Sequence, residues 1–280
     1  KIIYDIGANN GDDIPYYLMK GDKVVAVEAN PALVEGIREK FAAQILAGRL
    51  IVECCVVTDR ADLGDVDFYV HKTEHVLSRF PRPDETWFDQ FAHVKLPSKS
   101  IMSILREHGH PYYIKMDIEN YDVALLRAVF ESEVRPPFIS AEAQNLDVLS
   151  VLAGEGGYKA FKLVDGQTVS QVYANRTIEN QITHELTSYS FPYHSAGPFG
   201  DDIDGEWLTL ANFLMVLGLA GLGWKDIHAA YSVDPDPAAQ PQTVDLLGQL
   251  VTTSKLIAYT RKRVVSACLT RLRRLFDRSA

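Results

Sequence analysis

The turn Asp5-Ile6-Gly7-Ala8-Asn9-Asn10-Gly11 follows a β-rich run and has the residue types of a ligand-binding turn. In its Asp-x-Gly-x-x-x-Gly pattern, glycine lets the backbone turn tightly and approach a ligand closely. The fingerprint of dinucleotide-binding turns has glycine where Asn9 stands, so the pattern disfavours a diphosphate. Asp5 can instead accept a hydrogen bond from the amino group of a bound amino acid. The turn therefore predicts a site for a ligand without phosphate, with a packing role for both glycines as the alternative.

A second acid stands at the end of the next β-rich run. Glu28 follows Gly7 by 21 residues, which is where Rossmann-like folds place a carboxylate that binds ribose hydroxyls. Cys55 and Val56 end a third β-rich run, where an adenine ring would pack, and Asp59 lies just beyond. The alternatives are an exposed strand-end acid at Glu28 and ordinary core residues at Cys55 and Val56.

Charged residues also occupy a strand that should be central and buried. Lys115, Asp117 and Glu119 alternate along residues 112–119, and because a strand has a side-chain period of two they point to one side. Ligands of open α/β sheets bind beyond the carboxyl ends of the strands, where Asp117 and Glu119 fall. Glu142 has the same place on the next strand. Burial of unpaired charges is costly, so the pattern predicts either a functional cluster or mutual ion pairs.

The elements that would position these residues follow from the periodicity of the chain. Short β-rich runs alternate with segments of helical period, which is the pattern of βαβ units and a parallel sheet. Strands are expected at 1–6, 23–28, 50–57, 112–119, 138–144, 158–164 and 227–233. Helices are expected at 12–21, 30–48, 100–107, 123–131 and 146–154. The sequence predicts an α/β protein with a Rossmann-like, doubly wound, mostly parallel seven-stranded sheet.

Two segments do not fit this alternation. Residues 65–71 alternate like a hairpin or an extra edge strand, and the charged, proline-containing stretch 72–95 predicts a long loop of the kind that often forms a lid. Periodicity is lost again at about 166–226, an expected insertion that ends in an apolar run at 208–224. This run is shorter than the ~20 residues that span a bilayer, and it predicts a buried helix.

The chain after residue 233 is expected to divide into a proline-rich linker, 234–242, and a C-terminal basic amphipathic helix, 243–280. Its apolar residues recur at spacings that a helix places on one stripe. Between residues 255 and 278 it carries eight Lys and Arg against Asp277. Such a helix can lie on an anionic membrane surface, pack on an acidic body or pair in a homodimer, and packing or dimerisation is favoured.

The overall composition is that of an ordinary globular protein, with 47% hydrophobic and 23% charged residues among 280. A net charge of -9 argues against nucleic-acid binding, which needs clustered Lys and Arg, and favours a neutral or polar small substrate. The three cysteines have neither a disulfide framework nor a metal-ligand spacing, so no metal site is predicted. No signal segment opens the sequence, and a cytoplasmic location is expected.

Three motifs together resemble the FkbM-type methyltransferase family: the turn from Asp5 to Gly11, Val25-Ala-Val-Glu28-Ala-Asn-Pro31, and Lys115-Met-Asp-Ile-Glu119. Their order and spacing match through residues 1 to about 165. Later segments that are similar to the family are Phe161–Val164, Gly197–Gly200 and Trp224–Ala229. The chain departs from the family at Asn120-Tyr121-Asp122, where Glu-Gly-small-Glu is more usual, which leaves the role of Asp122 open.

This resemblance implies a class I methyltransferase domain at residues 1–233 that binds S-adenosylmethionine (SAM) and methylates a hydroxyl oxygen, commonly on a sugar or a polyketide. A small-molecule or glycan acceptor is therefore expected. The residues expected to bind SAM are Asp5, Gly7, Ala8, Asn9, Gly11, Glu28, Ala29, Asn30, Cys55, Val56 and Asp117. The alternatives are a non-catalytic SAM-binding module, against which the charged cluster argues, and a nicotinamide-dependent oxidoreductase, against which Asn9 argues.

Methyl transfer to an alcohol is an in-line displacement, so the protein has to position the acceptor and take its proton. Asp117 is the first candidate for this base because it ends a central strand. The other candidates are Glu119, Glu142 and the loop residues His75 and His194, with a surface or packing role as the alternative for each histidine. The same carboxylates could instead hold Mg²⁺.

Overall fold

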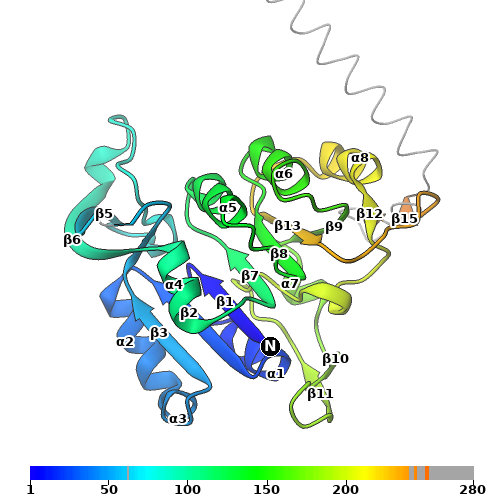
Figure 1. The fold of residues 1–280 in the computed structure, drawn as a ribbon, viewed down its shortest axis with the longest axis horizontal. Coiled ribbons are helices and arrows are strands. Elements are labelled where there is room, and N and C mark those ends of the chain that lie inside the picture. The colour runs from blue at the N-terminus through cyan, green and yellow to red at the C-terminus, as the bar shows by residue number, and fades with distance from the viewer. Residues whose placement is uncertain (62, 240–242, 245–249, 252–280) are drawn as a thin grey trace, which may run out of the picture.

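A computed structural model describes residues 1–61, 63–239, 243–244 and 250–251. At its centre lies a sheet of eight strands in the order β12-β9-β13-β8-β7-β1-β2-β3 (Figure 1). Neighbours from β3 to β8 pair parallel, whereas β13 is antiparallel to β8 and β9, and β12 to β9. The strands are β1 (Ile2–Ile6), β2 (Lys23–Glu28), β3 (Leu50–Cys54), β7 (Tyr113–Met116), β8 (Phe138–Glu142), β9 (Ala160–Asp165), β12 (Leu208–Thr209) and β13 (Lys225–Ala230). The predicted Rossmann-like, mostly parallel sheet is confirmed, and β12 adds an eighth strand of two residues.

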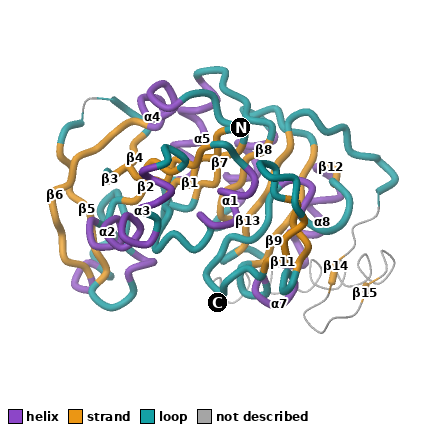
Figure 2. Tube along the Cα trace, turned by 90° about the horizontal axis from the view of Figure 1, so that it is seen from below, coloured by secondary structure: helices purple, strands orange, loops and turns teal. Residues whose placement is uncertain are grey.

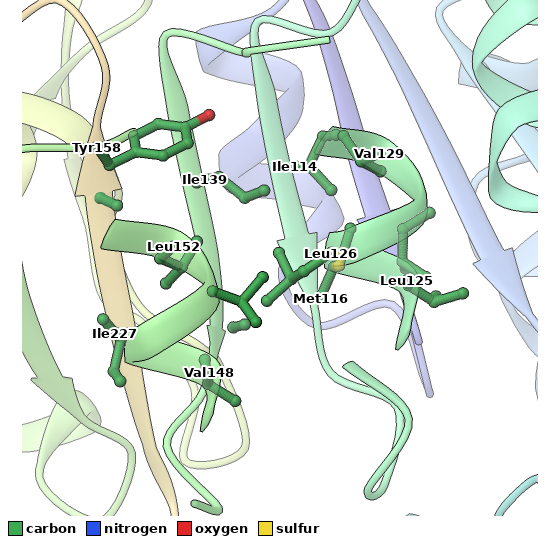
Figure 3. Close-up of a cluster of buried hydrophobic side chains, with 14 of the residues drawn as sticks. Ile114, Met116, Leu125, Leu126, Val129, Ile139, Val148, Leu152, Tyr158 and Ile227 are labelled. Carbon is green, nitrogen blue, oxygen red and sulfur yellow. The ribbon is translucent and has the colours of Figure 1, made fainter. Parts of the chain in front are cut away.

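Helices cover both faces of this sheet because alternate strand residues point to opposite sides and both sides are apolar. One face, which includes Ile3, packs against α1 (Ile14–Lys20), α2 (Pro31–Lys40), α3 (Ala42–Leu46) and α7 (Val169–Val172). The other, which includes Tyr4, packs against α4 (Ile101–His108), α5 (Asp122–Glu131), α6 (Leu146–Ala153) and α8 (Leu210–Ala220). Figure 3 shows α5 and α6 placing leucine and valine side chains on β7, β8 and β13.

The starts of two helices follow local capping rules. Asn30 precedes Pro31, and its side chain accepts a hydrogen bond from the N–H of Ala32 at 3.0 Å. Ser100 caps α4 in the same way. Asp13, which stands at the cap position of α1, makes no such bond.

The carboxylate of Asp13 instead accepts hydrogen bonds from the Ser195 hydroxyl and the N–H of Ala196. Asp13 is buried, and burial raises the pKa of its carboxyl to about 6, with Lys115 acting in the opposite direction. This residue therefore ties α1 to the segment that follows β9.

The third expected strand divides at Cys55. β3 ends before it, and β4 (Val56–Thr58) joins a separate sheet of order β4-β6-β5. β5 (Asp65–His71) matches the expected strand, but β6 (Phe91–Ser100) begins inside the stretch expected as a loop. Half of the residues of β6 are exposed and it contains Pro97, so its alternation of apolar residues is weak. The connection from β5 to β6 is therefore residues 72–90, with short 3-10 turns at His75–Leu77 and Phe88–Gln90.

The insertion after β9 contains a hairpin of β10 (Arg176–Glu179) and β11 (Leu186–Tyr189) and the helix α8, at the end of the molecule opposite the small sheet (Figure 2). α8 buries Phe213, Val216 and Leu217. Leu214 is 48% exposed. The expectation of a buried helix therefore holds for one face only, because α8 covers the edge of the sheet and has no layer outside it.

Within the described residues, no helix is long and apolar enough to cross a membrane. β14 (Thr243–Val244) and β15 (Leu250–Val251) pair antiparallel, so these four residues are not part of the expected C-terminal helix. The remainder of 243–280, and residues 240–242 of the expected linker, lie outside the described residues. Packing, dimerisation or membrane contact through this segment stays a prediction.

Candidate active site

A cavity of about 340 Å³ lies at the carboxyl ends of β1, β2, β7 and β8. Two parts of its lining have different origins. The strand-end wall consists of residues that end or follow strands: Gly7, Asn9, Glu28, Ala29, Cys55, Val56, Asp117, Glu119 and Glu142. The loop wall consists of residues 76–80 from the β5–β6 connection, together with His194 and Trp224 from the insertion. All of the strand-end wall and His194 were expected from the sequence to form the site.

The glycine turn is built around a close backbone contact. Gly7 has a φ of +84°, and a Cβ at this position would lie 2.0 Å from the carbonyl oxygen of Asp117. The N–H groups of Gly7 and Ala8 donate to the carbonyl of Val27 at 2.9 and 3.0 Å. Gly7 is therefore required because the turn packs on the end of β7, and the ligand side of the turn is formed by Gly7 and Asn9.

Four residues that were expected to bind SAM do not line the cavity: Asp5, Ala8, Gly11 and Asn30. Gly11 has a φ of +76°, and a Cβ there would lie 2.9 Å from the side chain of Ile14, so its role is packing. Asn30 caps α2. Asp5 is 1% exposed, with an oxygen 3.5 Å from the ammonium of Lys115. Burial raises the pKa of Asp5, and Lys115 opposes this effect.

Glu28 connects the turn to the start of α2. Its two carboxylate oxygens accept hydrogen bonds from the N–H of Asn9 at 2.9 Å and from the N–H of Asn30 at 2.8 Å. Burial raises the pKa of Glu28 to about 7, although these backbone donors act in the opposite direction. Each oxygen keeps a second lone pair, so Glu28 can still accept hydrogen bonds from a ligand in the cavity.

An apolar part of the cavity surrounds Cys55 and Val56. Phe80 of the loop wall and Ala29 both pack against the small core that contains Val56. The ring of Phe80 meets the ring of Tyr121 edge-on, with centroids 5.2 Å apart. The Tyr121 hydroxyl donates a hydrogen bond to Asp59 at 2.6 Å, so Asp59 helps to hold the ring of Tyr121 in place. Asp59 itself does not line the cavity. Phe80 and Tyr121 were not expected from the sequence.

The acids at the carboxyl ends of β7 and β8 have different partners. Asp117 lies 3.2 Å from the ammonium of Lys115 and is 41% exposed. Glu119 lies 3.3 Å from the guanidinium of Arg79, a loop-wall residue. The sequence predicted either a functional cluster of acids or mutual ion pairs, and the structure contains both. These two acids therefore meet the cavity as parts of ion pairs.

Glu142 differs because, within the described residues, its side chain accepts a hydrogen bond only from the amide of Gln144, at 2.6 Å. Burial and the nearby carboxylate of Asp117 raise the pKa of Glu142 to about 8. The surroundings of Glu142 therefore favour its protonated form. Asp122, whose role was left open, is buried, accepts from the N–H of Ile118 at 3.2 Å and does not line the cavity.

His194 is exposed at the cavity and stacks on Trp224, with ring centroids 5.9 Å apart. The side chain of His75 lies outside the part of the chain that the structure describes. Trp224 was not expected as a site residue. Its indole fills the space beside Gly166, where a Cβ would lie 2.4 Å from the ring nitrogen.

One group of potential metal ligands occurs among the described residues: Glu53, Glu107 and His108. None of the three lines the cavity. The ammonium of Lys99 lies 2.9 Å from Glu53 and 3.1 Å from Glu107, so a cation already balances these acids.

The fold is a Rossmann-like α/β domain of the class I methyltransferase type. Three features define it: the antiparallel strand β13, the helices on both faces of the sheet, and the cavity at the carboxyl ends of the parallel strands. The family follows from the sequence. The model described as "Methyltransferase FkbM domain" matches residues 5–158, more than half of the chain, and the chain belongs to this family. The resemblance seen in the motifs is thereby confirmed.

Solved structures that match the chain include methyltransferase FkbM from Methylobacillus flagellatus, with 19% identity over 59% of this chain and a TM-score of 0.40. The alignment spans 40% of that protein's length. The C-terminal domain of precorrin-6Y C5,15-methyltransferase from Rhodobacter capsulatus has 11% identity, with 82% of this chain and 79% of that one covered, and a TM-score of 0.38. No curated protein sequence matches the chain.

Proposed function

We propose that this methyltransferase-family protein uses SAM to methylate a hydroxyl oxygen of a small molecule, such as a sugar, glycan or polyketide-type metabolite. The observation that carries the proposal is that the residues predicted to bind the cofactor and the residues predicted to act on the acceptor lie in the same cavity. The glycine turn with Glu28, and the carboxylates Asp117 and Glu142, line one cavity. A donor and an acceptor bound there would be held together, which is the main requirement of an in-line displacement.

The residues of the cavity fit a nucleoside bearing an amino acid. Its volume of about 340 Å³ is within the range of small-molecule sites. The Oδ1 atom of Asn9 is buried and, within the described residues, has no hydrogen-bond partner. Cys55, Val56 and Phe80 offer an apolar surface for a base, and Glu28 offers acceptors for ribose hydroxyls. Bound SAM would supply a methyl group on a sulfonium.

The remaining chemistry belongs to the protein. Asp117 takes the proton of the acceptor hydroxyl, because it lines the cavity at the end of β7 and the ammonium of Lys115, 3.2 Å away, holds it in place. Glu142 keeps its proton near neutral pH and donates a hydrogen bond to the acceptor. Residues 76–80 of the loop wall limit the access of water.

The test begins with calorimetric titration of SAM, S-adenosylhomocysteine and NAD. Binding of the first two without NAD supports the proposal, because Asn9 stands where a diphosphate site has glycine. Binding of NAD without SAM would instead favour the oxidoreductase alternative. Labelled SAM is then incubated with pools of hydroxylated metabolites, with and without a chelator, and with Asp117→Asn as the control. SAM binding without transfer to any pool would leave a non-catalytic module.

A further inference from the structure

Lys115 is a buried lysine on a central strand that touches both the glycine turn and the candidate base. Its side chain is 6% exposed. The ammonium donates to the carbonyl of Gly7 at 3.1 Å, lies 3.2 Å from Asp117 and 3.5 Å from Asp5. One cation thus connects the turn, the end of β7 and a buried acid of β1.

The surroundings of Lys115 keep it charged. Burial lowers the pKa of this ammonium, but the carboxylates of Asp117, Asp5, Asp13 and Asp226 more than offset that effect, and its pKa lies well above the ordinary value. Among the described residues, no other Lys or Arg forms an ion pair with these four acids. Lys115 therefore remains a fixed positive charge beside Asp117 across the physiological pH range.

We propose that Lys115 is a positioning residue that locks the carboxylate of Asp117 and the glycine turn into one unit, so that base and cofactor turn keep a single relative placement. The role of Asp117 in this inference rests on the proposed function. The backbone supports the same link, because the α-carbon of Gly7 packs on the carbonyl of Asp117 so closely that no Cβ fits between them. Lys115 adds a side-chain link to that backbone contact.

Acids surround the carboxylate of Asp117 from several elements: Asp5 of β1, Asp122 of α5, Glu142 of β8, Asp226 of β13 and the neighbouring Glu119. Among the described residues, Lys115 is the only Lys or Arg that forms an ion pair with Asp117, at 3.2 Å. Loss of Lys115 therefore leaves Asp117 among these acids without its cation.

The experiment compares Lys115→Met with the wild type by following the carboxyl carbon of Asp117 in ¹³C-aspartate-labelled protein against pH, with the signal assigned from Asp117→Asn. The expected result is a titration midpoint higher by about one pH unit or more, the usual effect of an opposite charge at this distance. In a methyl-transfer assay the acidic limb of the pH–rate profile should move in parallel. SAM affinity should fall on the order of tenfold, since the turn loses a charge-assisted hydrogen bond.

Two further variants keep the test decisive. Lys115→Met leaves buried acids unbalanced, so Lys115→Met with Asp5→Asn removes one charge of each sign and serves if the single variant does not fold. Lys162→Met is the matched control. Lys162 is also a buried strand lysine, and it donates to the carbonyl of Ile203 at 2.7 Å, away from the cavity. It should lose stability without moving the Asp117 midpoint.

An Asp117 midpoint that is the same in the wild type and in both Lys115 variants would overturn the proposal and leave Lys115 a structural residue. This titration does not depend on catalysis. If the wild type fails to bind SAM, the proposed function falls while the link between Lys115 and Asp117 is still decided by the carboxyl signal.

Discussion

The two walls of the cavity are built by different means. The strand-end wall is held by backbone hydrogen bonds and strand pairing: the glycine turn bonds to Val27, and Glu28 accepts from two backbone N–H groups. Apart from the backbone bridge of Arg79 with Tyr69, the loop wall is held by side chains, through the ion pair of Arg79 with Glu119 and the stacking of His194 on Trp224. The first wall should therefore respond to substitution as a rigid unit, and the second should respond residue by residue.

Asp117→Asn tests the chemistry assigned to the strand-end wall and should give the largest effect. Turnover is expected to fall by roughly 10²–10⁴, the range for loss of a positioned general base. SAM affinity should change little, because the amide keeps the shape of the side chain. The measurements are kcat on a verified acceptor and the SAM dissociation constant. Unchanged turnover would make Asp117 structural and turn attention to Glu142 and His194.

Gly7→Ala tests whether this wall is as rigid as its backbone contacts indicate. The methyl group would meet the carbonyl of Asp117 at 2.0 Å, and the positive φ adds strain, so a loss of about 2–4 kcal/mol in unfolding free energy is expected. Gly48→Ala is the matched control. Its φ is +69° with open space around it, so only the strain of about 1 kcal/mol applies. Equal losses in urea unfolding would show that the turn can yield.

Glu28→Ala addresses the junction of the turn with α2. It should weaken SAM binding by about 1–3 kcal/mol, the range for hydrogen bonds to a charged group. The variant also frees the N–H groups of Asn9 and Asn30, so a lower melting temperature is expected alongside. Glu28→Gln keeps one acceptor oxygen and should lose less of both. Calorimetry and a thermal melt measure the two effects. An unchanged dissociation constant for SAM would show that Glu28 has only a structural role.

Glu142→Gln should have the smallest effect, and one that depends on pH. Burial and Asp117 raise the pKa of Glu142 from 4.5 to about 8, so the folded state favours the protonated form. The corresponding stability is fully present below about pH 4.5 and is lost as pH rises to about 8. The neutral variant escapes this loss. Urea unfolding should find it more stable than the wild type by roughly 1–2 kcal/mol at pH 8.5 and similar near pH 5. A difference independent of pH would contradict this assignment.

The contrast between the walls also explains what could be predicted from the sequence. Gly7, Glu28, Asp117 and Glu142 follow strands with strong apolar patterns, and the carboxyl ends of parallel strands meet at one edge of a sheet. Their assembly therefore follows from the order of the strands. The separation of β4 from β3 does not, because Cys55 and its neighbours read as one continuous apolar run.

The loop wall depends on contacts between segments far apart in the sequence. Phe80 meets Tyr121, and His194 meets Trp224, only after the small sheet and the insertion have been placed. No local period marks these residues. The role of Asp13 was hidden for the same reason: its position indicates a helix cap, whereas its partners, Ser195 and Ala196, lie more than 180 residues away in the sequence.

The small sheet β4-β6-β5 separates the part of the cavity that can vary in evolution from the part that has to stay the same. Residues 76–80 are carried by the connection between β5 and β6, and this connection is anchored where Arg79 and Tyr69 exchange backbone hydrogen bonds at 2.9 and 3.0 Å. Insertions or deletions elsewhere in residues 72–90 would reshape the mouth of the cavity without altering the glycine turn, Glu28 or Asp117. Proteins with this domain could thus come to accept different molecules through sequence changes in one surface segment. The glycine turn and the acids at the strand ends would be inherited unchanged.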